Sequence, residues 1–207
     1  MNSKQNLLAG GGGHLVLVAD NCTGQNKNRM VMRFVVWLVE KKFFAKVSLI
    51  FLVAGHTKNP CDRLFNLLKG EYRRRNIYNV DDLLKILDSH TMCSAERAPK
   101  FFGWDKYLDE LYQVPQGILK HHCFAVFEQR PTTIVMKRSD VCEYHVEVDV
   151  KLSANKVNDE QREQVLSEMP NKTKAPGIRL IKRVGRYKNY RQFVPDNYKD
   201  DELYKRG

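Results

Sequence analysis

Two apolar runs near the N-terminus give the first prediction about the fold. HLVLVA at residues 14–19 and KVSLIFLV at residues 46–53 are short and almost uniformly apolar. This is more typical of strands buried on both faces than of edge strands. A helix packed on the sheet is predicted between them, over residues 24–41, from apolar residues near helical spacing: Met30, Phe34, Trp37 and Leu38. The order strand, helix, strand indicates a parallel pair joined by a crossover helix.

Further helices are predicted from capping residues and apolar spacing. Asn59 and Pro60 are typical of a helix start, and the helix that follows has an apolar stripe that we expect in the core: Leu64, Phe65, Leu68 and Tyr72. Asn79 is expected to begin a helix over residues 80–90, and another helix is expected over residues 104–112.

After His122 the apolar residues alternate with a period of two. Residues 123–128, 132–138 and 143–152 are predicted as three strands, the first two joined by a short turn at residues 129–131. The predicted fold class is therefore α/β, with parallel strands and crossover helices followed by a small antiparallel β unit. The predicted segments are a flexible leader (1–13), an α/β core (14–120), the antiparallel unit (121–155), and a helix with a basic C-terminal arm (156–207).

The basic arm covers residues 171–195. It contains eight Lys or Arg and no Asp or Glu, interleaved with Tyr187, Tyr190 and Phe193. Pro176 and Pro195 predict an extended segment. Such an arm fits neutralisation of a phosphate backbone with stacking of bases on the aromatic rings. The alternative is a solvated tail folded over an acidic face of its own domain.

Composition and charge narrow the function classes. The chain has 207 residues, is 43% apolar, and carries a formal net charge of +11 with a pI near 9.4. The surplus favours a polyanionic partner. No apolar run is long enough to cross a membrane, and no signal peptide is recognisable at the N-terminus. Five cysteines without a C-x-x-C pair favour reduced thiols in an intracellular protein.

Two aspartates follow the two predicted parallel strands. Asp20 comes directly after the first strand, and Asp62 lies one turn into the helix after the second. Parallel strands place their carboxyl ends at one edge of a sheet, where α/β proteins bind ligands. Carboxylate oxygens suit Mg²⁺, so the pair is a candidate metal site for attack on a phosphodiester.

Structural alternatives exist for each of these residues. Asp20 and Asn21 could cap the helix that follows them, and Asp62 could be a first-turn acid stabilised by the helix dipole. His56 could be an ordinary turn or buried histidine. His121 and His122 begin a strand with alternating faces, so we interpret them as one surface and one core residue.

The residues around the two aspartates carry a family resemblance. DNCTGQNKN at residues 20–28 and GHTKNPCDRLFNLLK at residues 55–69 resemble an uncharacterised family of transposon-derived proteins. Its members read D-N-C-x-G-Q-N-K-N and G-H-T-K-x-x-x-D-x-x-F. The order of elements is also similar to the second half of the ribonuclease H-like core of DDE/D cut-and-paste transposases, especially mariner-like ones. The resemblance is strongest over residues 15–75 and extends to the basic arm.

This resemblance implies roles for single residues. Asp20 would be the second acid and Asp62 the third, together holding Mg²⁺ or Mn²⁺, while His56, Asn21 and Lys58 would contact metal or orient phosphate. The first acid of such a core lies on a preceding β-hairpin, for which residues 1–13 leave no room. The resemblance therefore implies an ancestral DNA nuclease and strand transferase that is incomplete or inactive alone.

DNA is the implied partner, and an intracellular, nuclear location goes with it; a homo-oligomer is a further option. Predicted nucleic-acid contacts are Asn21, Lys27, Lys58, Arg73, Arg74, Lys182, Arg183, Arg186, Lys188 and Arg191. Two other function classes stay open. One is a non-catalytic nucleic-acid-binding or interaction module. The other is a divergent α/β phosphoesterase that takes a missing acid from Asp81 or Asp82.

Overall fold

The chain folds into two compact units, each assembled from two separate stretches of sequence. The structure, a computed structural model, describes residues 12–52, 60–90, 94–95, 100–153, 155–174 and 180–205, without the side chains of residues 60, 61, 180 and 183. Unit 1 comprises Met1–Thr57 and Gly103–Asn171, and unit 2 comprises Lys58–Phe102 and Lys172–Gly207. These divisions differ from the predicted segments, because the last third of the chain contributes to both units.

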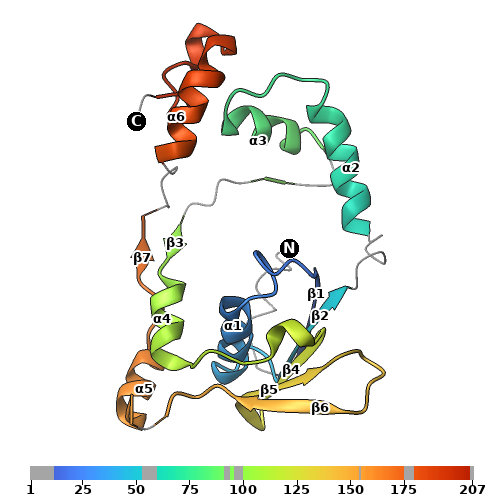
Figure 1. Ribbon diagram of the computed structural model, residues 1–207, viewed down its shortest axis with the longest axis vertical. Helices are drawn as coiled ribbons and strands as arrows, with labels where there is room; N and C mark the ends of the chain where they lie inside the picture. The colour runs from blue at the N-terminus through green and yellow to red at the C-terminus, as the bar shows by residue number, and fades with distance from the viewer. Residues whose placement is uncertain are drawn as a thin grey trace. The chain divides into compact units, whose positions relative to one another are not determined.

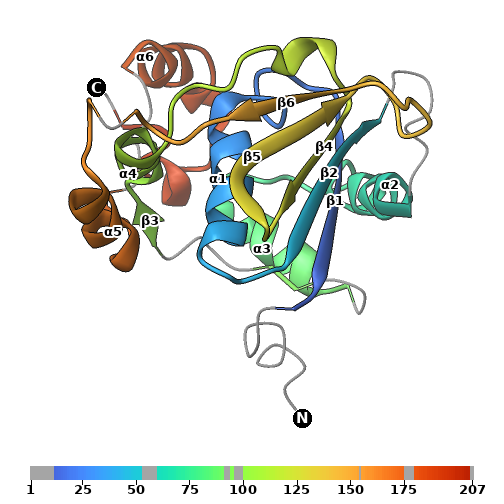
Figure 2. The same ribbon diagram turned by 90° about the horizontal axis from the view of Figure 1, so that it is seen from below.

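Unit 1 is built on one five-stranded mixed sheet with the order β1-β2-β4-β5-β6, whose strands lie side by side in Figure 2. β1 and β2 are parallel, as predicted, and the remaining neighbours are antiparallel. The strands are β1 (His14–Asp20), β2 (Lys46–Leu52), β4 (Cys123–Phe127), β5 (Arg130–Lys137) and β6 (His145–Asp149). The predicted α/β class is confirmed, but the antiparallel strands extend the sheet of the parallel pair rather than forming a β unit of their own.

The position of β1 corrects one prediction. Among the described strands it lies at the edge of the sheet and pairs only with β2. Its side chains alternate in exposure, with Val16 49% and Val18 58% exposed. Leu15, Leu17 and Ala19 are partly buried against the core on one face of the strand, and Val16 and Val18 are exposed on the other face.

The core of unit 1 lies between the sheet and helix α1 (Arg29–Glu40). Asn28 starts this helix: its side-chain oxygen accepts hydrogen bonds from the amides of Met30 and Val31 at 2.9 and 3.1 Å, which satisfies two free donors of the first turn. The buried face of the helix packs against the strands, and the principal core residues are Met32, Val35, Val36, Val39, Val47, Leu49, Phe51, Phe124, Val126, Ile134 and Met136.

An aromatic cluster joins α1 to helix α4 (Trp104–Leu111). The Trp37 and Trp104 rings meet edge to face at 4.9 Å, and the Trp37 indole N–H donates to the Tyr107 hydroxyl at 3.1 Å. Arg33, buried on α1, pairs with Asp109 on α4. These contacts are consistent with the predicted helix over residues 104–112.

Helix α5 (Asp159–Ser167) is held to α1 by a buried ionic contact. Asn158 and Gln161 form a capping box at its start. Arg162 donates to the Glu40 carboxylate at 2.7 Å, and the same oxygen accepts a hydrogen bond from the Tyr112 hydroxyl at 2.6 Å. The contact spans 122 residues of sequence, so α5, which was predicted to belong to the C-terminal segment 156–207, shares the core of α1.

Unit 2 contains helices α2 (Pro60–Tyr72), α3 (Val80–Asp88) and α6 (Leu180–Asn189) and a two-stranded ribbon of β3 (Phe101–Phe102) with β7 (Lys172–Thr173). Figure 1 labels these elements. Short helical turns η2 (Arg191–Phe193) and η3 (Asp196–Tyr198) follow α6, and a further turn, η1 (Ile118–Lys120), precedes β4 in unit 1.

Two predictions for unit 2 are wrong. The basic arm is not extended throughout, because its central residues form α6. Phe65, expected in the core, is exposed on α2, whereas Leu68 of the same stripe is buried. The predicted start of α3 is confirmed, because the Asn79 side chain accepts a hydrogen bond from the Asp82 amide at 2.9 Å.

Candidate functional site

Asp20 is the last residue of β1 and is exposed at the carboxyl end of the strand. A polar turn follows, in which the Cys22 carbonyl accepts hydrogen bonds from the amides of Gln25, Asn26 and Lys27. The turn brings the Asn26 side chain back to donate to the Asp20 carboxylate. Asn28, rather than Asp20 or Asn21, caps α1, so the capping alternative for these two residues is wrong and the Asp20 carboxylate stays at the sheet edge.

Lys27 is placed differently from the prediction that it contacts nucleic acid. It is only 2% exposed, and its ammonium donates to the Leu119 carbonyl at 3.3 Å and lies 5.5 Å from the centre of the Phe51 ring. Burial lowers the pKa of its amine below the ordinary value. Lys27 thus supports the interior of unit 1 and is not on an exposed phosphate track.

His122, which was not among the predicted site residues, is a polar group at the same end of the sheet as Asp20. Its carbonyl accepts a hydrogen bond from the Phe51 amide at 2.8 Å, near the carboxyl end of β2. Its Nδ1 is buried and has no hydrogen-bond partner among the described residues. Burial lowers its pKa, and the nearby charges of Lys27 and His121 lower it further. The sequence showed only that His122 directly precedes a predicted strand; the pairing of this strand with β2 is seen in the fold.

The neighbouring His121 is the more buried of the two. Its Nδ1 donates to the Gly117 carbonyl at 2.9 Å. The predicted division into one surface and one core residue therefore holds only in part, because His122 is half-buried rather than exposed.

The other predicted site residues are His56, Lys58 and Asp62. His56 and Lys58 lie outside the described residues. Asp62 is exposed in the first turn of α2. It belongs to unit 2 and Asp20 to unit 1, so a metal ion shared by the two carboxylates stays a prediction.

The described residues do not make a complete magnesium cage. No three His, Cys, Asp or Glu side chains come together in the described part of the chain, whereas a protein site for a hard cation needs several oxygen ligands. Asp82, considered as a substitute acid, uses its two oxygens within unit 2, where they accept hydrogen bonds from the Tyr78 amide and the Tyr198 hydroxyl. No catalytic step through a metal follows from this arrangement.

Positive charge is distributed very unevenly between the units. Unit 2 has 20 of the 35 Lys and Arg but only 10 of the 24 Asp and Glu, so its formal charge is +10 and that of unit 1 is +1. The predicted contacts Arg73, Arg74, Lys182 and Lys188 are exposed in unit 2. Arg191 is half-buried; it donates to the Lys199 carbonyl at 3.1 Å and stacks on the Tyr187 ring. Arg183 lies within α6.

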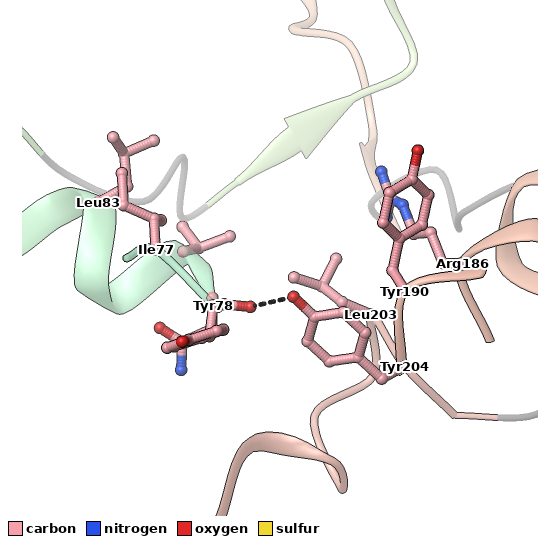
Figure 3. A pocket seen from close by; sticks show the side chains of 9 residues that line it. Ile77, Tyr78, Leu83, Arg186, Tyr190, Leu203 and Tyr204 are labelled. Carbon is pink, nitrogen blue, oxygen red and sulfur yellow. Dashed lines mark hydrogen bonds between the residues drawn. The ribbon is translucent and has the colours of Figure 1, made fainter. Parts of the chain in front are cut away.

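Unit 2 also contains a pocket of about 510 Å³. Its lining comes from two segments of the chain: the start of α3, with Tyr78 and Leu83, and the C-terminal segment, with Arg186, Tyr190 and Tyr204 (Figure 3). The pocket therefore combines aromatic surface with a guanidinium group. Sequence spacing gave no indication of it, because its two segments are about a hundred residues apart in the chain.

A family model for a domain of unknown function, DUF7869, matches residues 10–143. The chain belongs to the DUF7869 family. No curated protein matches the chain, and no solved structure does.

The DUF7869 match covers both predicted metal-binding aspartates but only one part of the pocket in unit 2. It includes β1 with Asp20, the start of α2 with Asp62, and the α3 side of the pocket. It ends before α6, which provides Arg186, and before Tyr190 and Tyr204. Within the described ranges, no helix of this DUF7869 protein is both long and apolar enough to cross a membrane.

Proposed function

We propose that this protein binds DNA through unit 2 and that it derives from a DDE/D transposase with a ribonuclease H-like core. The observation that carries the binding proposal is the formal charge of +10 on unit 2 against +1 on unit 1. The parallel pair β1–β2, with Asp20 at its carboxyl end, supports the proposed origin.

The physical basis is neutralisation of phosphates. Each Lys or Arg that contacts a DNA phosphate releases condensed counterions, and this release supplies most of the sequence-independent affinity. Lys182 and Lys188 on α6 are exposed, and no ion pair ties either of them to an acid among the described residues. They are therefore available to phosphate oxygens without first breaking an internal contact.

The test compares two charge-matched double variants in the full chain. Lys182→Gln with Lys188→Gln removes two positive charges from unit 2, and Lys106→Gln with Lys156→Gln removes two from exposed positions of unit 1. Binding of a fluorescein-labelled 20-bp duplex is followed by anisotropy. We expect weaker binding for the first variant only. Equal weakening by both variants would show that net charge, and not unit 2, determines affinity.

A second candidate function is metal-dependent cleavage of DNA, favoured by the exposed Asp20 carboxylate beside Asn21 at the carboxyl end of a parallel strand. Mg²⁺ or Mn²⁺ would be the metal, with Asp20 and Asp62 as its predicted protein ligands. The test is nicking of supercoiled plasmid by the wild type, Asp20→Ala, Asp62→Ala, and Asp105→Ala, an exposed acid of unit 1, as control.

Loss of nicking in the first two variants, with activity kept in the control, would support cleavage by this site. Nicking by Asp20→Ala at the wild-type rate would eliminate this site as its source. DNA binding without any nicking would support the binding function and not the cleavage function.

A further inference from the structure

The pocket of unit 2 has one preformed wall. The Tyr204 hydroxyl donates to the Tyr78 carbonyl at 2.7 Å, drawn as the dashed line in Figure 3. The Tyr78 ring packs against the Tyr198 ring at 5.0 Å between centroids, and the Tyr78 amide donates to Asp82 at 3.1 Å. Burial raises the pKa of Tyr204, and the charge of Asp201 adds to this effect, so the phenol stays neutral. This wall is fixed before any ligand arrives.

The opposite wall is open and carries the cation. Tyr190 is 61% exposed, and both Tyr190 and Arg186 line the pocket from the C-terminal segment (Figure 3). The two residues are four positions apart, and the Tyr190 amide donates to the Arg186 carbonyl at 3.0 Å, so they share one side of the helix end. Lys182 stands another four residues earlier and continues that side. Along this side of the helix, the Tyr190 ring is thus followed by two cations, Arg186 and Lys182.

We propose that this pocket receives an unpaired base of single-stranded DNA. The base would stack on Tyr190 between apolar walls, and the flanking phosphates would lie along Arg186 and Lys182. This inference rests on the proposed function and makes it more specific, because a base inside a duplex is paired and stacked and cannot enter.

Three properties favour a nucleobase over another ligand. The volume of about 510 Å³ lies within the range of small-ligand pockets. Tyrosine rings have flat faces on which any base can stack, so this interaction does not depend on the DNA sequence. The charge of +10 on the unit complements phosphates on both sides of the base. An acidic peptide would satisfy the charge but not the flat faces.

The experiment measures binding of the full chain to two labelled strands of equal length and charge. One is a 20-mer of thymidine, and the other is the same backbone with abasic sites throughout. The variants are Tyr190→Ala and Tyr190→Phe, with Tyr144→Ala as control, because Tyr144 is 72% exposed, belongs to unit 1 and does not line the pocket. An acidic 20-residue peptide serves as the competing polyanion.

The wild type is expected to bind the thymidine strand about 5- to 150-fold more tightly than the abasic strand, as stacking of one base provides. Tyr190→Ala should lose this difference and keep its affinity for the abasic strand. Tyr190→Phe and Tyr144→Ala should keep the difference, because a phenylalanine ring also stacks and because Tyr144 is outside the pocket.

Three results would overturn the inference. Equal binding of both strands by the wild type would show that no base is bound in the pocket and that the protein contacts only the phosphates. A uniform loss on both strands in Tyr190→Ala would indicate a structural role for the ring, and tighter binding of the acidic peptide than of the thymidine strand would identify another class of ligand. Absence of binding to every nucleic acid would refute the proposed function itself.

Discussion

The ionic contact between α1 and α5 provides a direct test of how unit 1 is assembled. The Glu40 side chain is 11% exposed and that of Arg162 is 4% exposed. One Glu40 oxygen accepts hydrogen bonds from both Arg162 and Tyr112, and the Arg162 guanidinium lies 5.6 Å from the centre of the Tyr112 ring. Replacing Arg162 with Met leaves a buried carboxylate without its countercharge, and replacing Glu40 with Leu leaves a buried guanidinium.

Each single change is expected to lower the free energy of unfolding by about 3–5 kcal/mol, because breaking a buried pair leaves one uncompensated charge. The double variant should be much less affected, since hydrophobic replacement of a whole buried pair is often neutral. Its main cost is the Tyr112 hydroxyl without an acceptor, about 1–3 kcal/mol. The buried Arg162 Nε has no hydrogen-bond partner among the described residues, so its removal in the double variant offsets part of this cost. The coupling energy should therefore be about 3 kcal/mol or more.

The assay is urea unfolding followed by tryptophan fluorescence. The chain has two tryptophans, and both Trp37 and Trp104 lie in unit 1, so the signal follows this unit even if the two units unfold separately. Lys151→Met is the control, because it removes an exposed ion pair with Asp159 and should change the free energy of unfolding by less than about 1 kcal/mol. Two results would contradict this coupling between Glu40 and Arg162. One is a double variant in which the two losses of unfolding free energy simply add, and the other is a loss for Arg162→Met no larger than that for Lys151→Met.

Three further predictions follow from the site. Neutralising Lys182 and Lys188 should make the plot of log affinity for duplex DNA against log salt less steep by about 1.8, so that the loss of affinity from 50 to 200 mM salt is about 12-fold smaller; an unchanged slope in anisotropy titrations would mean that neither lysine contacts phosphate. Burial lowers the pKa of Lys27 in the folded protein below 10.5, so the unfolded chain binds more protons than the folded one between the folded and the unfolded pKa. The stability of the wild type, measured by urea unfolding, should therefore rise with pH up to 10.5 relative to that of Lys27→Met. Parallel stability curves for the two proteins would contradict this. The lowered pKa of His122 affects stability in acid, because the unfolded chain binds the proton first as the pH falls through 6.5. The wild type should therefore lose stability in acid relative to His122→Asn. An equal loss in both proteins would exclude His122 as the group responsible.

Local patterns in the sequence predicted the secondary structure well where capping residues and periodicity agree. Asn79 caps α3, and the alternating run after His122 forms β4 and β5. Such residues act on their own helix or strand, so a local pattern contains the necessary information.

The predictions that failed depend on contacts between distant residues. β2 pairs with β4, which lies some seventy residues further along the chain, and nothing in HLVLVA shows that β1 would be left at the edge. The prolines around the basic arm suggested an extended chain, but a proline restricts only itself and the residue before it. The ten residues of α6 lie between Pro176 and Pro195 and are free to form a helix.

The candidate site was foreseeable only in part. The turn after β1 identified Asp20 correctly as a residue at the carboxyl end of a strand, because this placement follows from local order. The capping role of Asn28 instead of Asp20 depended on the length of the turn. The concentration of positive charge in unit 2 became visible only when residues 58–102 and 172–207 were brought into one unit.

The most direct test of the DNA-binding proposal is protection of lysines from acetylation by bound DNA, read by mass spectrometry on the full chain. We expect Lys182 and Lys188 to react more slowly in the complex, while Lys106 and Lys156 in unit 1 react at the rate of the free protein. Protection of Lys106 and Lys156 with no protection on α6 would contradict it and would place the DNA-binding surface on unit 1.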